Sequence, residues 1–260
     1  MKIRIKNIFR IKFPKKTTIE GNIRKRTILS FTVFFMFLIA CIFIIAWIFH
    51  QPKDNKAYKP LRKVLNQNEK LFNKIFSNNN LSKTYPKEKA AKKVRVNGGI
   101  GLESNIDTAN WKLQLVRNPG DTIFITLADI KSLPKKDVVF DFKCIEGWSQ
   151  VSHWAGVTFA DFMTAYHLND QEKMKYTGMH TPDNKYYVGI DMESMLHPQT
   201  ILCYEMNGKP LPMDQGAPLR LIIPIKYGVK HIKRIGTIYF SNERPPDYWY
   251  ERGYDYYCGL

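Results

Sequence analysis

The sequence has few cysteines, and none of them stands in a paired motif. The four are Cys41, Cys144, Cys203 and Cys258. No two have the C-x-x-C spacing, which excludes a recognisable zinc knuckle and a thioredoxin-type redox site. The C-x-x-C-H motif is also absent, so this chain attaches no c-type haem. The cysteines by themselves leave the cellular compartment open.

Acidic residues are scarce in two segments only. The chain has 40 Lys and Arg against 23 Asp and Glu, a formal net charge of +17. Residues 1–27 hold ten basic residues and one acid, and residues 50–93 hold twelve and three. Residues 94–260 are nearly neutral, with eighteen basic and nineteen acidic residues. Because the excess charge lies on the two sides of one apolar segment, we expect no nucleic-acid binding.

Charged residues are absent from Ile28 to Phe49. A helix of that length spans about 33 Å, enough to cross a hydrocarbon core of about 30 Å. The run is too long for a signal-peptide core and has no small-residue cleavage site at its end. We therefore predict an uncleaved transmembrane helix at 28–49. The alternative is a buried core helix, but a soluble helix does not need to be apolar on every face.

The basic residues beside this helix bear on its orientation. Arg24, Lys25 and Arg26 precede it and favour a cytoplasmic N-terminus, with the following domain outside the cytoplasm. Lys53, Lys56 and Lys59 follow it and weaken that bias. The expected arrangement is a single-pass membrane protein whose domain lies on the periplasmic side.

The chain divides into four regions: a basic arm at 1–27, the transmembrane helix at 28–49, a basic polar spacer at 50–93 and a domain at 94–260. The spacer has apolar residues at helical spacing between Leu61 and Ile75, which predicts a short amphipathic helix near an anionic membrane surface. In the domain, helices are expected to begin at Thr126 and Phe159. Strands are predicted at 111–116, 123–127, 137–142, 185–190, 200–206, 220–225 and 236–240. This pattern predicts a β-rich α+β fold.

Cys144 directly follows one of the predicted strands and precedes Glu146-Gly147-Trp148. A cysteine at a strand end, beside a Gly-containing turn, is well placed for a site, and its thiolate is a soft ligand for a transition metal. Two other interpretations stay open. Cys144 is a buried core cysteine in one of them, and forms a disulfide with Cys203 or Cys258 in the other.

A second cluster, at residues 220–234, has five fixed cations and a histidine without any acid. The cations are Arg220, Lys226, Lys230, Lys233 and Arg234. Arg and Lys supply charge-assisted donors to phosphate, so the cluster is a candidate phosphate-binding loop. The alternative is a solvated basic strand edge.

The order of the motifs resembles a known family. The Cys144 turn is followed by His197-Pro198, the Asn207-Gly208 hairpin, Gly216-Ala-Pro-Leu-Arg220, Pro224-x-Lys-Tyr-Gly228 and Glu243-Arg-Pro-Pro246. This series resembles the molybdopterin-binding domain of the sulfite oxidase superfamily. Within it, the series is most similar to the periplasmic methionine sulfoxide reductase catalytic subunits of bacteria. The resemblance covers residues 111–249 and implies a sulfite-oxidase-type fold.

The resemblance also implies roles for single residues. Cys144 would be the thiolate ligand to the molybdenum of a molybdenum–molybdopterin cofactor. Thr181 and Arg220 match cofactor contacts, and Gln215 stands where the reductases have Asn. His231, Ile232 and Lys233 match the loop that holds the pterin phosphate. Asn97 is the nearest candidate for a cofactor contact that the family takes from its N-terminal stretch.

The activity implied by this resemblance is oxygen-atom transfer at molybdenum, with reduction of S-oxides or N-oxides as the first choice. Electrons would come from a membrane cytochrome or a quinol-linked donor, because the chain has no haem or iron–sulfur motif. The alternatives are a sulfite-type oxidase and a metal-free binding module that keeps the fold. Lys25-Arg26 resembles the twin-arginine export signal only imperfectly, since Lys stands in the first Arg position.

Overall fold

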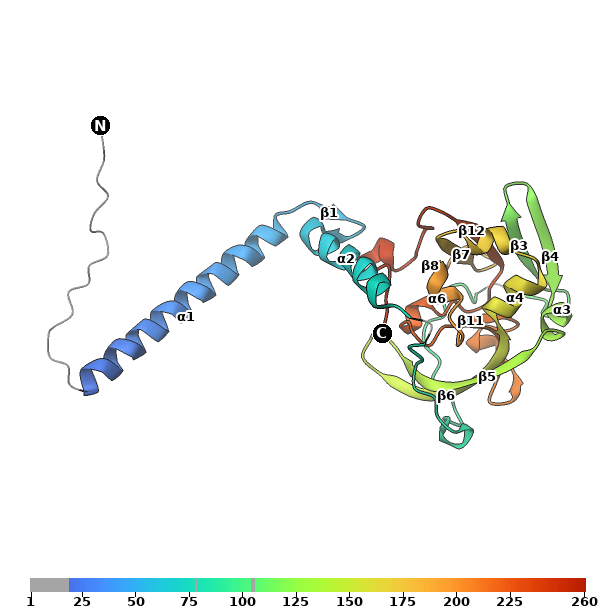
Figure 1. Ribbon diagram of the computed structural model, residues 1–260, viewed down its shortest axis with the longest axis horizontal. Helices are drawn as coiled ribbons and strands as arrows, with labels where there is room; N and C mark the ends of the chain where they lie inside the picture. Colours follow the sequence, from blue (N-terminus) through green and yellow to red (C-terminus); the bar gives the residue numbers. More distant parts are fainter. Residues whose placement is uncertain (1–18, 78, 104–105) are drawn as a thin grey trace. The chain divides into compact units, whose positions relative to one another are not determined.

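The computed structural model describes residues 19–77, 79–103 and 106–260. The chain forms two compact units, which divide after Gln51 (Figure 1). Most of the predicted basic arm lies outside the described residues.

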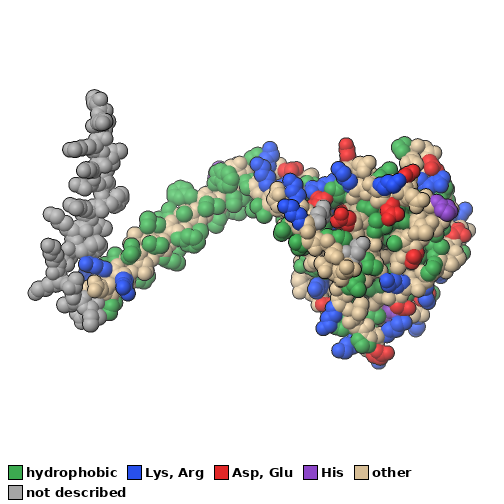
Figure 2. Space-filling view, viewed as in Figure 1, with side chains coloured by type: hydrophobic (Ala, Val, Ile, Leu, Met, Phe, Trp, Pro, Cys, Tyr) green, Lys and Arg blue, Asp and Glu red, His purple; other side chains and the backbone are tan. Residues whose placement is uncertain are grey.

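The first unit contains one long helix, α1 (Ile19–Phe49). The helix includes the predicted span and extends it at its N-terminal end by nine residues. Among the described residues, α1 is the one helix long and apolar enough to cross a membrane. Apolar side chains cover its surface along most of its length (Figure 2), and none in its most apolar stretch is buried. This exposure argues against the alternative of a soluble core helix.

The second unit, residues 52–260, begins with a small hairpin and a helix, β1 (Lys53–Asp54), β2 (Ala57–Tyr58) and α2 (Lys59–Ile75). Its remaining helices are short: α3 (Leu127–Lys131), α4 (Phe159–Ala165), α5 (Asn169–Glu172) and α6 (Met192–Met195). Single 3₁₀ turns occur at Lys87–Lys89, Met213–Gln215, Gly228–Lys230 and Tyr250–Arg252. The predicted helix start at Thr126 is confirmed, because the Thr126 and Asp129 side chains form a reciprocal capping box.

Two five-stranded sheets form the framework of this unit. One has the order β10-β9-β6-β5, with β11 also paired to β9. Its strands are β5 (Lys135–Lys143), β6 (Ser149–Thr158), β9 (Ile201–Met206), β10 (Lys209–Pro210) and β11 (Arg220–Ile222). The other has the order β4-β3-β12-β7-β8. Its strands are β3 (Lys112–Asn118), β4 (Asp121–Thr126), β7 (Tyr176–His180), β8 (Tyr187–Asp191) and β12 (Thr237–Ser241). The predicted β-rich α+β class is confirmed.

Among the described strands, all pairs are antiparallel except β12 with β3. The larger core contains apolar residues of both sheets, such as Leu113 and Ile238 on one and Leu202 and Leu221 on the other. A smaller cluster around Phe140 also belongs to the β5–β6–β9–β11 sheet. This sheet therefore has apolar packing on both faces, and its strand ends are firmly positioned.

The segment expected to be a spacer differs from that prediction, because the compact unit begins at Pro52 rather than near Val94. The expected helix is present as α2, but two of its charged residues are buried, Arg62 against the C-terminal segment and Glu69 against Tyr176 of β7. Residues 84–91 run beside β5 and β6, where Tyr85 N–H donates to Val139 O. These contacts could not be predicted from the polar composition of the segment, because they are made by buried charged side chains and by backbone atoms.

Candidate functional site

Cys144 lies in the tight turn that joins β5 to β6. The turn is closed by two backbone hydrogen bonds, from Cys144 N–H to Trp148 O at 2.9 Å and from Gly147 N–H to Cys144 O at 3.0 Å. Gly147 has a φ of +90°, in the left-handed region that favours glycine. The long β5–β6 pairing thus ends in a rigid turn that holds the cysteine at the edge of the sheet.

The thiol of Cys144 faces a cavity of about 130 Å³. The cysteine is not in a disulfide, and its sulfur accepts one long hydrogen bond, from Asn97 Nδ2 at 3.5 Å. Glu146 accepts from Asn97 Nδ2 and from Trp148 Nε1, each at 3.2 Å. The predicted disulfide alternative is therefore absent, and the sulfur is available to a molecule in the cavity.

Arg220, the first residue of β11, is a buried cation at this cavity. Its Nη1 donates to the backbone and side-chain oxygens of Gln215, both at 3.0 Å, and its guanidinium lies 4.6 Å from the Trp154 ring centre. Nε has no hydrogen-bond partner. Burial lowers the pKa of Arg220 to about 10. Among the described residues no carboxylate pairs with it, so the site favours an anionic group.

Lys233 is the second cation at the cavity. Its ammonium donates to the carbonyls of Asn97 at 2.8 Å, Gly98 at 2.9 Å and Asp214 at 3.2 Å. Burial, and then the nearby charge of Arg220, lower its pKa to about 8. The charge of Asp214 acts in the opposite direction but forms no ion pair with Lys233, so the positive charge stays available to a further anion.

His231 lines the cavity but is held as a neutral structural residue. Its Nε2 donates to Lys226 O at 3.1 Å, and its Nδ1 accepts from Ile223 N–H at 3.4 Å. Burial, and then the charge of Arg220, lower its pKa to about 3. His231 therefore offers no charged imidazole to an anion in the cavity, and its backbone N–H already donates to Gly228 O.

The structure brings six of the eight candidate site residues to this cavity or to the smaller hollow beside it. The six are Asn97, Cys144, Gln215, Arg220, His231 and Lys233. Thr181 lines neither the cavity nor the hollow. It lies in the turn after β7, where its hydroxyl donates to the Asp183 carboxylate at 2.6 Å. Ile232 packs in the larger core, and its N–H donates to Lys230 O.

The basic cluster at 220–234 is only partly a binding surface, which corrects the prediction of one continuous phosphate-binding loop. Lys226 is buried in an ion pair with Asp191 at 2.7 Å, and Lys230 in one with Asp247 at 2.5 Å. Arg234 donates to backbone carbonyls, including Ala217 O at 3.2 Å. The solvated-edge alternative is wrong for these three as well, since all are buried.

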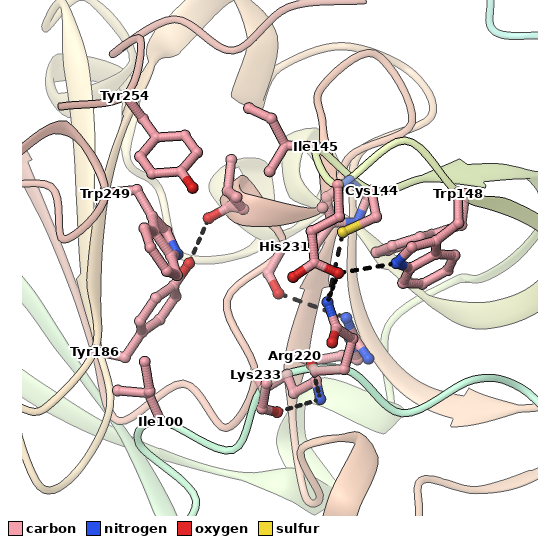
Figure 3. Close-up of a pocket in the computed structure, with 16 residues that line it drawn as sticks. Ile100, Cys144, Ile145, Trp148, Tyr186, Arg220, His231, Lys233, Trp249 and Tyr254 are labelled. Carbon is pink, nitrogen blue, oxygen red and sulfur yellow. Dashed lines mark hydrogen bonds between the residues drawn. The ribbon is translucent and has the colours of Figure 1, made fainter. Parts of the chain in front are cut away.

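An aromatic wall lies across the cavity from Cys144. Figure 3 shows Tyr186, Trp249 and Tyr254 on the side of the cavity opposite Cys144 and Trp148. The Tyr186 hydroxyl donates to Val229 O at 2.6 Å, and burial raises its pKa well above the ordinary value. These residues are absent from the predicted site. The dense aromatic run at residues 248–257 is the signal that points to Trp249 and Tyr254, whereas no such signal points to Tyr186.

The donor set at the cavity fits a metal that arrives with its own ligands. Within the described residues, no group of three or more His, Cys, Asp and Glu is placed to hold a metal ion. A metal at Cys144 would therefore need further ligands from an organic cofactor. The unpaired Nε of buried Arg220 and the ammonium of Lys233 would suit the anionic parts of such a cofactor.

Comparison with known proteins gives consistent matches. Residues 100–249 match the family model described as "Oxidoreductase molybdopterin binding domain". A protein of Azospira oryzae, provisionally named a protein-methionine-sulfoxide reductase subunit, is 33% identical over 71% of this chain and 70% of its own length. The catalytic subunit of protein-methionine-sulfoxide reductase from Campylobacter jejuni is 30% identical over 58% of this chain and 55% of its own length. Among solved structures, the sulfane dehydrogenase SoxCD of Paracoccus pantotrophus aligns with a TM-score of 0.48 and 15% identity, over 54% of this chain and 40% of its own.

Proposed function

From the membership of this chain in the molybdopterin-binding oxidoreductase family, we propose that it holds a molybdenum–molybdopterin cofactor through Cys144 and catalyses oxygen-atom transfer. The observation that carries the proposal is the free thiol of Cys144, which lines the same cavity as Arg220. This arginine is buried, its Nε has no hydrogen-bond partner, and no carboxylate of the described residues pairs with it. When bound, the cofactor supplies the two-electron chemistry.

The residues of the chain bind and orient the reactants. Cys144 supplies the protein thiolate, and the rigid turn keeps its sulfur in one position. Arg220 would hold an anionic group of the cofactor by a charge-assisted hydrogen bond from its unpaired Nε, and Lys233 would add its positive charge. Glu146 fixes Asn97 and Trp148 beside the sulfur. The side chains of Thr181 and Ile232 have no role in this proposal, because neither lines the cavity or the hollow beside it.

The cavity suits a neutral, partly apolar substrate. Apart from Arg220 and Lys233, its described lining has no fixed cation, and the neutral His231 adds none. Sulfite would need additional cations, whereas the apolar S-methyl group of a methyl sulfoxide would pack on Tyr186, Trp249 and Tyr254. We therefore propose reduction of S-oxides or N-oxides rather than oxidation of sulfite.

The reaction requires an external electron donor. Reduction of a sulfoxide to a sulfide consumes two electrons and two protons and releases water. We propose that α1 crosses the membrane with the N-terminus in the cytoplasm, and that a membrane cytochrome or quinol-linked protein supplies the electrons. The apolar, unburied length of α1 supports the anchor.

Two measurements test the proposal. Protein from a molybdenum-replete host should contain about one molybdenum per chain by elemental analysis. It should oxidise reduced viologen with methyl sulfoxides and N-oxides, and should be slow with sulfite and ferricyanide. Fast sulfite oxidation would favour the oxidase, and a metal-free chain would favour a binding module.

A further inference from the structure

Helix α2 is fixed to its unit through one face. Arg62 donates to the backbone carbonyls of Asn55 at 3.0 Å, Tyr250 at 2.9 Å and Tyr254 at 2.7 Å. Glu69 accepts from the Tyr176 hydroxyl at 2.6 Å and pairs with Arg244. These contacts set the rotation of α2 about its axis.

The fixed rotation leaves an apolar stripe in solvent. Leu61, Val64, Leu71 and Ile75 are 45%, 65%, 57% and 59% exposed. Their spacings of three, seven and four residues place them on one face of a helix. At 3.6 residues per turn, this face points about 135° away from Arg62 and Glu69. The stripe therefore faces away from the domain.

The charges that α2 exposes are all positive. Its two other charged residues, Arg62 and Glu69, are buried, and the exposed charged residues are Lys59, Lys63, Lys70 and Lys74. Lys63 and Lys74 lie about 100° around the helix from the centre of the stripe, and Lys59 and Lys70 lie farther round on the same side. Basic side chains gather over the part of the unit where α2 lies (Figure 2). An apolar face flanked by lysines is typical of a helix in a lipid interface.

The chain itself keeps α2 near the end of α1. Nine residues, 50–58, separate Phe49 from Lys59. Such a segment reaches at most about 30 Å when fully extended, and part of it is folded into the β1–β2 hairpin. If α1 crosses the membrane, the first residue of α2 cannot lie farther than that from the end of α1.

We infer that the stripe of Leu61, Val64, Leu71 and Ile75 docks onto the surface of an anionic lipid bilayer, with the flanking lysines among the headgroups. The inference rests on the membrane anchor in the proposed function. Lysine side chains can extend toward phosphates while the stripe enters the acyl boundary. Arg62 binds the carbonyl of Tyr254, a residue of the aromatic wall, so docking would also hold that wall at a fixed height above the bilayer.

The test uses the full chain in lipid nanodiscs with an environment-sensitive fluorophore. The dye is attached to V64C or L71C on the stripe, and to K70C on the lysine face or D170C on α5 as controls. Labelled wild-type protein measures the background from the native cysteines. In discs containing phosphatidylglycerol, emission from positions 64 and 71 should shift to shorter wavelength and be quenched by spin-labelled lipid. The shift should be smaller in phosphatidylcholine discs and at position 70, and absent at position 170.

Each other outcome has a defined meaning. Water-like emission from positions 64 and 71 in anionic discs would overturn the inference. A shift that persists in detergent and grows with protein concentration would assign the stripe to a second copy, which also overturns it. Carbonate extraction of the same samples reports on the anchor separately. Stripe labels that stay in water on a carbonate-resistant chain would refute docking and keep the anchor. Shifted labels on a released chain would support docking and refute the anchor.

Discussion

Replacing Cys144 by Ser should abolish turnover while leaving the fold nearly unchanged. The side chain is 7% exposed, and its sulfur accepts only a hydrogen bond of 3.5 Å from Asn97. A serine hydroxyl has the same partner available, so the free energy of unfolding should fall by about 1 kcal/mol or less. Loss of the metal ligand should lower sulfoxide reduction at least about 100-fold, since even indirect changes at metal sites cost 10–100-fold.

Cys203 offers a matched control of the same residue type. It is fully buried in the smaller core, and burial raises the pKa of its thiol to about 12, so it remains protonated at neutral pH. Cys203→Ser places a hydroxyl in that core and should cost about 1–3 kcal/mol of stability. Its activity per folded molecule should match that of the wild type.

The two variants are compared by urea unfolding, metal content and viologen-linked sulfoxide reduction. We expect Cys144→Ser to lose activity but not stability, and Cys203→Ser to lose stability but not activity. Full activity in Cys144→Ser, with about one molybdenum per chain, would refute the assignment of the ligand. A large loss of stability in that variant would instead identify Cys144 as a core residue.

Three further predictions follow from buried charged or titratable groups. Arg220→Met should lower molybdenum content and sulfoxide turnover at least about 10-fold, whereas Arg117→Met in a surface ion pair should not; equal metal content in both would contradict the role of Arg220. His231 has a folded pKa of about 3 against 6.5 when unfolded, so below pH 6.5 only the unfolded chain gains its proton. Urea unfolding should show that wild type loses about 2 kcal/mol more than His231→Gln between pH 6.5 and pH 5, and identical losses would refute this. Arg62→Met should lower the free energy of unfolding by about 3 kcal/mol, while exposed Lys63→Met should change it by less than about 0.5 kcal/mol; similar effects in urea unfolding would contradict the structural role of Arg62.

Strands whose signal is local could be predicted from the sequence. β3, β5 and β9 lie close to their expected ranges, and the Asn207-Gly208 turn forms with both residues at positive φ. β6 was not predicted, although it is ten residues long. Its second half is buried on both sides, so it has no alternating pattern, and Gly156 lies where the Leu202 backbone approaches closely.

The roles of the cations could not be predicted from the sequence. Arg220 and Lys233 lie at the cavity, but Lys226 and Lys230 are neutralised by Asp191 and Asp247. Those acids are 35 and 17 residues away from their partners. A run of basic residues without a local acid therefore appears uncompensated in the sequence, although long-range folding supplies the counter-charges.

The sequence alone determined the long apolar helix, the β-rich domain and the position of Cys144 at a strand end, because each depends on neighbouring residues. Tertiary structure alone decided which cations face the cavity, which aromatic residues close it and which face of α2 stays exposed. The physical reason is that Tyr186, Trp249 and Tyr254, like Arg62 and its carbonyl partners, meet only when distant segments pack together.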